Sequence, residues 1–170
     1  MPANTVVRAI REGSALTQNA AARQLGITPG TLAAYEGAHV TPSQSRTWEI
    51  ARGLALGSPA KGEADPRFLL TYELFGQRFA ADGNGRIVVF HDPWVAHEQA
   101  ERLANAGFLN VALVPIWRSR RRSLVARVKA SGEVRGDHMA DPIADLISYA
   151  SRLAAHFDAF QYGTRQETEE

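Results

Sequence analysis

The chain has 170 residues, of which 45% are hydrophobic and 22% are charged, and its formal net charge at pH 7 is +1. This composition is typical of a globular protein with room for one ordinary domain or two small ones, and it excludes a polycation that coats nucleic acid indiscriminately. The absence of cysteine excludes disulfides and thiolate metal sites. No apolar run approaches the ~20 residues of a membrane span, so we expect a cytoplasmic protein without a membrane partner.

The stretch from Thr17 to Glu36 predicts two short helices joined by a tight turn. The Thr17 hydroxyl can cap the first helix, and Gly26 can end it in the left-handed conformation. Thr28 can cap the second helix, and Pro29 suits its first turn, where a missing N–H costs nothing. Small and apolar residues fall on the facing sides of the two helices: Ala21, Ala22, Leu25, Ile27, Leu32 and Tyr35. This spacing predicts a helix-turn-helix.

Two further helices are expected on either side of this pair, at Thr5–Glu12 and Ser43–Leu56. The second has an inward face made of Thr47, Trp48, Ile50, Ala51 and Leu54. Because all the connections are short, residues 1–57 predict a compact all-α bundle that forms the first domain.

A spaced set of residues runs through this bundle: Arg11, Leu16-Thr17-Gln18, Ala22, Leu25-Gly26-Ile27-Thr28, Thr31-Leu32, Tyr35-Glu36, Pro42-Ser43, Ile50-Ala51 and Leu54. Over residues 4–57 this pattern resembles the phage-repressor and Cro-like helix-turn-helix, the XRE family. The resemblance implies a lambda-repressor-like fold whose helix 29–35 docks in the major groove of double-stranded DNA. It also implies an ion pair inside the domain between Arg11 and Glu36, with a structural role.

The resemblance further implies which residues contact DNA. Pro29, Gly30 and Ala34 match base-facing positions, and Gln18 matches a phosphate contact. The other implied DNA-binding residues are Thr17, Thr28, Thr31, Ala33 and Arg46. None of the base-facing side chains can form the bidentate hydrogen bonds that discriminate between bases by ~1–3 kcal/mol each. The scaffold therefore predicts docking, whereas its exposed residues carry little base-reading chemistry.

Residues 58–66 are polar, contain two prolines and predict a linker. Residues 67–162 predict a small α+β domain of order ββαβ(β)α with its helices on one face of the sheet, followed by a disordered tail at 163–170. The expected elements are strands Phe68–Ala80 and Arg86–His91 joined by a hairpin turn, a helix that starts at Pro93, strand Asn110–Trp117, a candidate strand Ser123–Val128, and a helix Ile143–Phe160. We expect this domain to form a homodimer or to add a second DNA contact.

Positive charge is concentrated in residues 118–140, which hold seven Lys or Arg and two Asp or Glu. Its densest part contains Arg118, Arg120, Arg121 and Arg122. One interpretation is a second DNA contact that binds phosphates. The alternatives are a solvated edge strand whose charges prevent sheet-to-sheet aggregation, or a segment paired with the acidic last helix.

No set of residues predicts a catalytic, metal or cofactor site, so we do not expect an enzyme. His91-Asp92 and His97-Glu98 lack an established ligand spacing, and Asp92 is a helix cap. We predict a sequence-specific DNA-binding transcriptional regulator, a repressor. The alternative is an antitoxin or adaptor whose C-terminal domain binds a protein partner. A third class, a ligand-sensing regulator with a pocket in the α+β domain, has no residue in its favour.

Overall fold

The computed structural model describes residues 5–74, 76–83, 86–128, 133–137 and 141–149. Its helices are α1 (Val6–Gly13), α2 (Gln18–Leu25), α3 (Pro29–Glu36), α4 (Gln44–Leu54), α5 (Pro93–Asn105) and α6 (Arg118–Val128). Its strands are β1 (Arg67–Leu74), β2 (Gln77–Ala80), β3 (Asp82–Gly83), β4 (Arg86–Phe90), β5 (Leu109–Ile116) and β6 (Glu133–Arg135). Residues 142–149 form a further helix. In this described part, no helix is long and apolar enough to cross a membrane.

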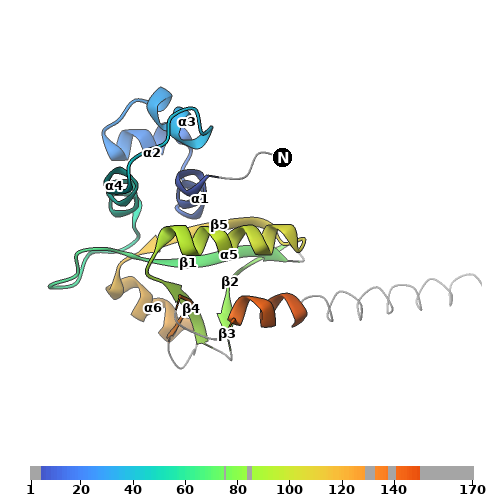
Figure 1. The fold of residues 1–170 in the computed structure, drawn as a ribbon. Coiled ribbons are helices and arrows are strands. Elements are labelled where there is room, and N and C mark those ends of the chain that lie inside the picture. The colour runs from blue at the N-terminus through green and yellow to red at the C-terminus, as the bar shows by residue number, and fades with distance from the viewer. Residues whose placement is uncertain (1–4, 75, 84–85, 129–132, 138–140, 150–170) are drawn as a thin grey trace, which may run out of the picture.

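The fold class predicted from the sequence is confirmed: a helical bundle, α1–α4, precedes a small sheet with helices (Figure 1). In the bundle, Ala21, Ala22 and Leu32 are completely buried where α2 and α3 cross. The expected inward residues of α4 are also buried, apart from Trp48, which is half-buried. The predicted helix from Pro93 is α5, and the Asp92 carboxylate accepts the first N–H groups of this helix.

β1 is the central strand of the sheet. One edge of β1 pairs with β5 along its length, and the other edge pairs first with β4 and then with β2. β3 pairs with β4, and β6 adds to β4 in parallel orientation. Alternate side chains of β1 point to opposite faces, so Phe68 and Leu70 enter the main core while Leu69 joins a smaller cluster on the other face.

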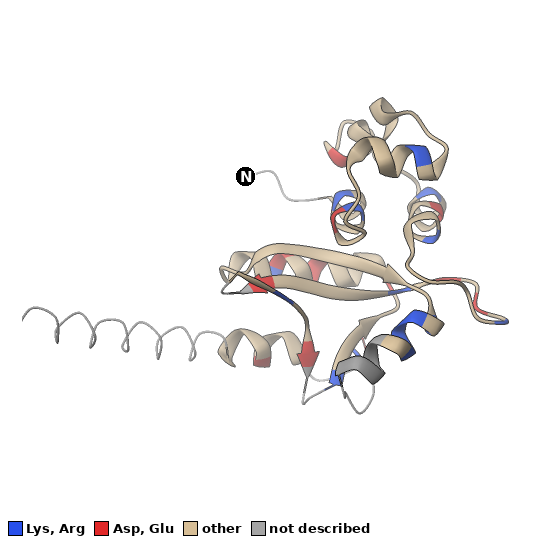
Figure 2. Ribbon diagram, turned by 180° about the vertical axis from the view of Figure 1, so that it is seen from behind, with Lys and Arg blue, Asp and Glu red and all other residues tan. Residues whose placement is uncertain are grey.

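Several elements of the α+β half differ from the sequence prediction. The expected strand Phe68–Ala80 is a hairpin, β1 and β2, because the chain reverses at Gly76, whose φ is +75°. The candidate strand Ser123–Val128 is wrong, since this segment is the second half of helix α6. The residues between the candidate strand and the expected last helix, for which no element was predicted, contain β6. Helices flank both faces of the sheet rather than one, because α5 and α6 lie on opposite sides of it (Figures 1 and 2). The end of the last helix and the expected disordered tail lie outside the described residues.

The helical bundle and the sheet share one hydrophobic core. α1 crosses β5 so closely that a Cβ added at Gly13 would lie 1.8 Å from the Leu113 carbonyl oxygen. On α4, the Trp48 ring packs against Phe68 and Trp94 with ring centroids 5.6 and 6.3 Å away. α1 and α4 therefore form the side of the bundle that faces the sheet, and α2 and α3 lie on the side away from it (Figure 1).

The segment expected to be a linker makes specific contacts on both sides. Leu56, just before it, forms a parallel bridge with Ile116 of β5, with backbone hydrogen bonds of 2.9 Å to Pro115 and Trp117. Asp65 accepts a 2.7 Å bond from Arg52 of α4. These contacts attach the connection to both the bundle and the sheet.

Candidate nucleic-acid interface

The helix pair α2–α3 is built by local capping interactions. The Thr17 hydroxyl accepts the Ala20 N–H at 3.2 Å, and Gly26 ends α2 in the left-handed conformation with φ +69°. The Thr28 hydroxyl accepts the Thr31 N–H at 3.2 Å, and Pro29 occupies the first turn of α3. Each of these residues has the position that its chemistry predicts.

The structure brings the implied DNA-binding residues of α2 and α3 together on the side of the bundle away from the sheet. Thr17, Gln18, Thr28, Pro29 and Gly30 are exposed. Thr31, Ala33 and Ala34 are half-buried, and the Thr31 hydroxyl shares a 2.8 Å hydrogen bond with Thr28. No part of the α+β domain covers this surface in the described residues, so α3 is free to enter a groove.

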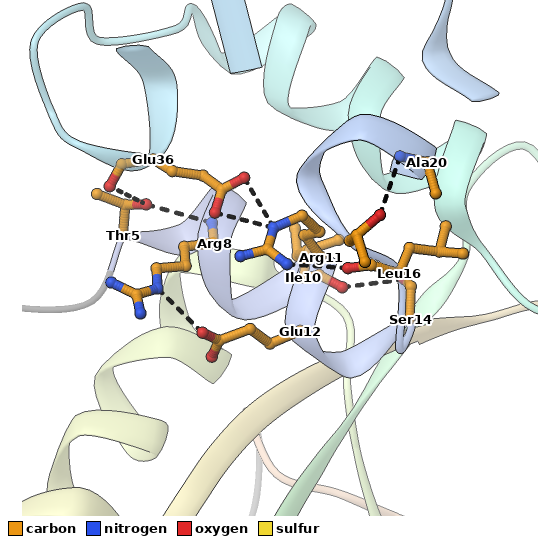
Figure 3. A network of polar contacts seen from close by, with 10 residues as sticks. Thr5, Arg8, Ile10, Arg11, Glu12, Ser14, Leu16, Ala20 and Glu36 are labelled. Atoms are coloured by element: carbon orange, nitrogen blue, oxygen red, sulfur yellow. Dashed lines mark hydrogen bonds and ion pairs between the residues drawn. The ribbon is translucent and has the colours of Figure 1, made fainter. Parts of the chain in front are cut away.

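An ion pair inside the bundle holds α3 against α1. Arg11 Nε lies 2.9 and 2.8 Å from the two Glu36 carboxylate oxygens, and the same guanidinium donates to the Leu16 carbonyl at 2.9 Å (Figure 3). The Thr5 hydroxyl donates to the Glu36 carbonyl at 3.2 Å. Because Glu36 is only 7% exposed and fully partnered, this network serves the fold and fixes the end of α3.

Arg46 lies near the start of α4, beside the end of α3, and its positive charge already has a partner. Its guanidinium lies 2.7 Å from the Glu49 carboxylate. Hydrogen bonds to Glu49 and then to Tyr35 hold the Arg46 pKa above its ordinary value. A phosphate that binds Arg46 must therefore compete with Glu49.

The basic segment forms helix α6 and not the edge strand that one interpretation of the sequence expected. Arg118, Arg120 and Arg122 are exposed on α6. Arg121 is buried, and its guanidinium donates to the Ile116 carbonyl at 3.2 Å and lies 3.5 Å from Glu63. Arg121 is thus turned toward the interior, so a second DNA contact would rest on the three exposed arginines and stays a prediction.

Residues 7–59 match a family model described as helix-turn-helix. The N-terminal bundle is an XRE-type helix-turn-helix. This family carries a DNA-binding domain, and the match covers about the first third of the chain, with no family match in its C-terminal part. No curated protein and no solved structure matches the chain.

Three residues that sequence reasoning missed affect the XRE bundle or the basic helix. Arg23 is an exposed cation on α2. Its position on the predicted helix could have revealed this exposure. Glu49 neutralises Arg46, and its spacing of three residues on one helix was a readable signal. Glu63 caps α6 by accepting the Arg118 N–H at 3.0 and 3.2 Å. The sequence carries no signal for that contact, because 55 residues separate the partners.

A cleft of about 140 Å³ lies where the XRE bundle meets α5. The loop after α3 forms one wall of this cleft, and Tyr35 and Trp94 contribute aromatic rings. Sites for small-molecule ligands usually measure about 300–1,000 Å³. The cleft is below that range and gives no support to the ligand-sensing hypothesis.

Proposed function

We propose that this protein is a sequence-specific repressor of transcription that binds double-stranded DNA in the cytoplasm by docking α3 in the major groove, and that it is not an enzyme. The observation that carries this proposal is the free α2–α3 surface. The bundle attaches to the sheet through α1 and α4, so the attached domain does not obstruct a duplex. A compact body held firmly on a promoter excludes other proteins, which is sufficient for repression.

In this proposal, the start of α2 and the start of α3 point at the sugar-phosphate backbone. Gln18 at the first position of α2 donates to a phosphate, where the helix dipole adds favourable potential. Thr28 and Thr31 lie at the start of α3, and Gly30 beside them lets the backbone approach a groove wall closely. A homodimer would read a palindrome with half-sites one helical turn, about 34–36 Å, apart.

Selection of bound sequences from a random DNA library, with the full chain, tests the proposal. We expect an enriched motif and binding that weakens as salt rises. Gln18→Glu places a carboxylate against the phosphate while remaining compatible with a helix start, and it should weaken binding at least about tenfold, or 1.4 kcal/mol. Gln77→Glu makes the same charge change at an exposed position on β2 and serves as the matched control.

Two outcomes would overturn the proposal. The first is that no enriched motif with salt-dependent binding is found, and the second is that the two glutamate substitutions have equal effects.

The second candidate function, an antitoxin or adaptor that binds a protein partner, is favoured by one observation. α3 presents proline, glycine and alanine to the groove, none of which forms a bidentate base contact. Co-purification of one stoichiometric partner that survives DNase treatment would support this alternative.

A further inference from the structure

The distribution of paired and unpaired arginines separates the bundle from α6. Four of the five arginines in α1–α4 have a carboxylate within 2.9 Å: Arg8 with Glu12, Arg11 with Glu36, Arg46 with Glu49, and Arg52 with Asp65. Arg23 is the exception among them. In contrast, Arg118, Arg120 and Arg122 on α6 are exposed and have no carboxylate partner among the described residues. Compared with the bundle, α6 therefore carries more uncompensated positive charge.

The exposed residues of α6 form a surface suited to phosphate groups. With 3.6 residues per turn, Arg118 and Arg122 lie on one side of the helix and Arg120 lies on the other side of its exposed face. Ser123 is exposed between them around the helix. Arginine guanidinium groups with a hydroxyl between them match the oxygen atoms of successive phosphates.

This surface is held in place by buried contacts. Arg121, in the same turn, points inward to Glu63 and the Ile116 carbonyl. The Ser119 hydroxyl donates to the Ser58 carbonyl at 3.0 Å, and Glu63 caps the helix. The three exposed arginines consequently project from a fixed helix, which reduces the entropy lost when they bind.

The position of α6 decides which phosphates it meets. α2 and α3 lie at one end of the molecule and α6 at the other, with the sheet between them (Figures 1 and 2). A smooth bend of 40–90° in a 20–30 bp site already costs on the order of 1–6 kcal/mol. Reaching both ends of the molecule with one short duplex would require a still stronger bend, so α6 faces a different segment of DNA.

We propose that the Arg118, Arg120 and Arg122 face of α6 binds the phosphate backbone of a second DNA segment, so that one molecule joins two segments. This inference rests on the proposed docking of α3 for the first segment. The second contact would be independent of base sequence, because these side chains would contact only the phosphate backbone of the DNA.

The experiment compares four full-length proteins: the wild type, Gln18→Glu, the α6 variant R118Q/R120Q/R122Q, and a control, R78Q/R86Q/R135Q, that removes the same charge from three strands of the sheet. Binding of a labelled random-sequence duplex is measured between about 50 and 200 mM salt. A second assay asks whether protein held on one immobilised duplex captures a second, labelled duplex.

For the wild type, we expect log K for the captured second duplex to fall against log salt with a slope of about 2–3, since each neutralised phosphate contributes about 0.9. The α6 variant should lose capture of the second duplex, whereas the control should keep both the capture and its slope. Capture that persists in the α6 variant would overturn the proposal, because two bundles of a dimer would then hold the two duplexes. Absence of capture by the wild type, or capture that does not weaken as salt rises, would also overturn it.

The two proposals fail in different ways. If Gln18→Glu leaves duplex binding intact while the α6 variant abolishes it, docking of α3 is refuted and the α6 contact stands. If Gln18→Glu abolishes binding and the α6 variant has no effect on slope or capture, the α6 contact is refuted and α3 docking stands.

Discussion

Gly13 offers a direct test of the close contact between the helix-turn-helix bundle and the sheet. It is the last residue of α1, and a Cβ added there would lie 1.8 Å from the Leu113 oxygen, 2.4 Å from the Leu113 carbonyl carbon and 3.0 Å from the Val114 nitrogen. All three atoms belong to the backbone of β5, which pairs with β1 and cannot rotate away. We therefore expect Gly13→Ala to force α1 away from the sheet.

The expected cost follows from the geometry. A carbon atom normally approaches a carbonyl oxygen to about 3.3–3.6 Å, so α1 must move by about 1.5 Å. Overpacking of a core typically costs 1–3 kcal/mol, and a clash between two backbones belongs at the upper end of that range. Alanine gains up to about 1 kcal/mol over glycine in a helix interior and less at a helix end. The net loss should be about 2–3 kcal/mol, or a fall in Tm of about 4–12 °C.

Urea and thermal unfolding followed by circular dichroism measure this loss, and two other helical glycines provide controls. Gly30→Ala meets open space, with the nearest atom 4.0 Å away, and should stabilise the protein by a few tenths, about 0.3–0.5 kcal/mol, because Gly30 is the second residue of α3. Gly53→Ala meets the tip of the Leu25 side chain at 2.5 Å, which can rotate, so its cost should be smaller than that of Gly13→Ala. If Gly13→Ala unfolds at the same urea concentration as Gly30→Ala, the close packing of α1 on β5 is refuted.

Three further predictions follow from the ion pairs and the buried phenol. Glu49→Gln should free Arg46 for phosphate and tighten duplex binding by up to about fivefold, or 1 kcal/mol, with little change in stability because the pair is exposed; weaker binding in a salt titration would contradict this. Glu63→Gln removes the charge that faces the buried Arg121 guanidinium and should cost about 1–3 kcal/mol in urea unfolding, and an unchanged midpoint would refute the role of that pair. Burial, with the Asp82 carboxylate adding to it, raises the pKa of the Tyr72 phenol above its ordinary value. The unfolded chain then ionises first, so stability should fall as pH rises above about 10; Tyr72→Phe should flatten this fall, and equal pH profiles of the two proteins would argue against the shift.

The helix-turn-helix was predictable because its chemistry is local. Thr17 and Thr28 each cap a helix that starts at the next residue, and Gly26 adopts the left-handed conformation required at a helix end. Asp92 likewise caps α5 through residues two and three positions away. In each case, the interacting groups lie within one turn of each other, so the pattern could be read without the rest of the fold.

The basic helix was misread because its conformation depends on distant residues. The segment after β5 was interpreted as a strand, but it forms helix α6. Glu63 accepts the Arg118 N–H at the start of this helix, and the Arg121 side chain points inward. The hairpin at Gly76 was missed for a related reason. The stretch Phe68–Ala80 is rich in aromatic and β-compatible residues, which fit one long strand as well as two short ones, and pairing within the sheet selects between them.

The sequence by itself determined the helical bundle, its caps and the division into a helical part and a sheet-containing part, because short-range capping and side-chain periodicity specify these features. The Arg11–Glu36 pairing came from the family resemblance alone, since 25 residues separate the partners. Only the tertiary structure decided that the two parts share a core through Gly13 and Trp48. It alone assigned Arg121 to the interior and left Arg118, Arg120 and Arg122 exposed on the side away from α3. The physical reason is that the Arg121–Glu63 pair and the approach of Gly13 to β5 each join residues more than 50 positions apart. These residues come close together only when the sheet has formed.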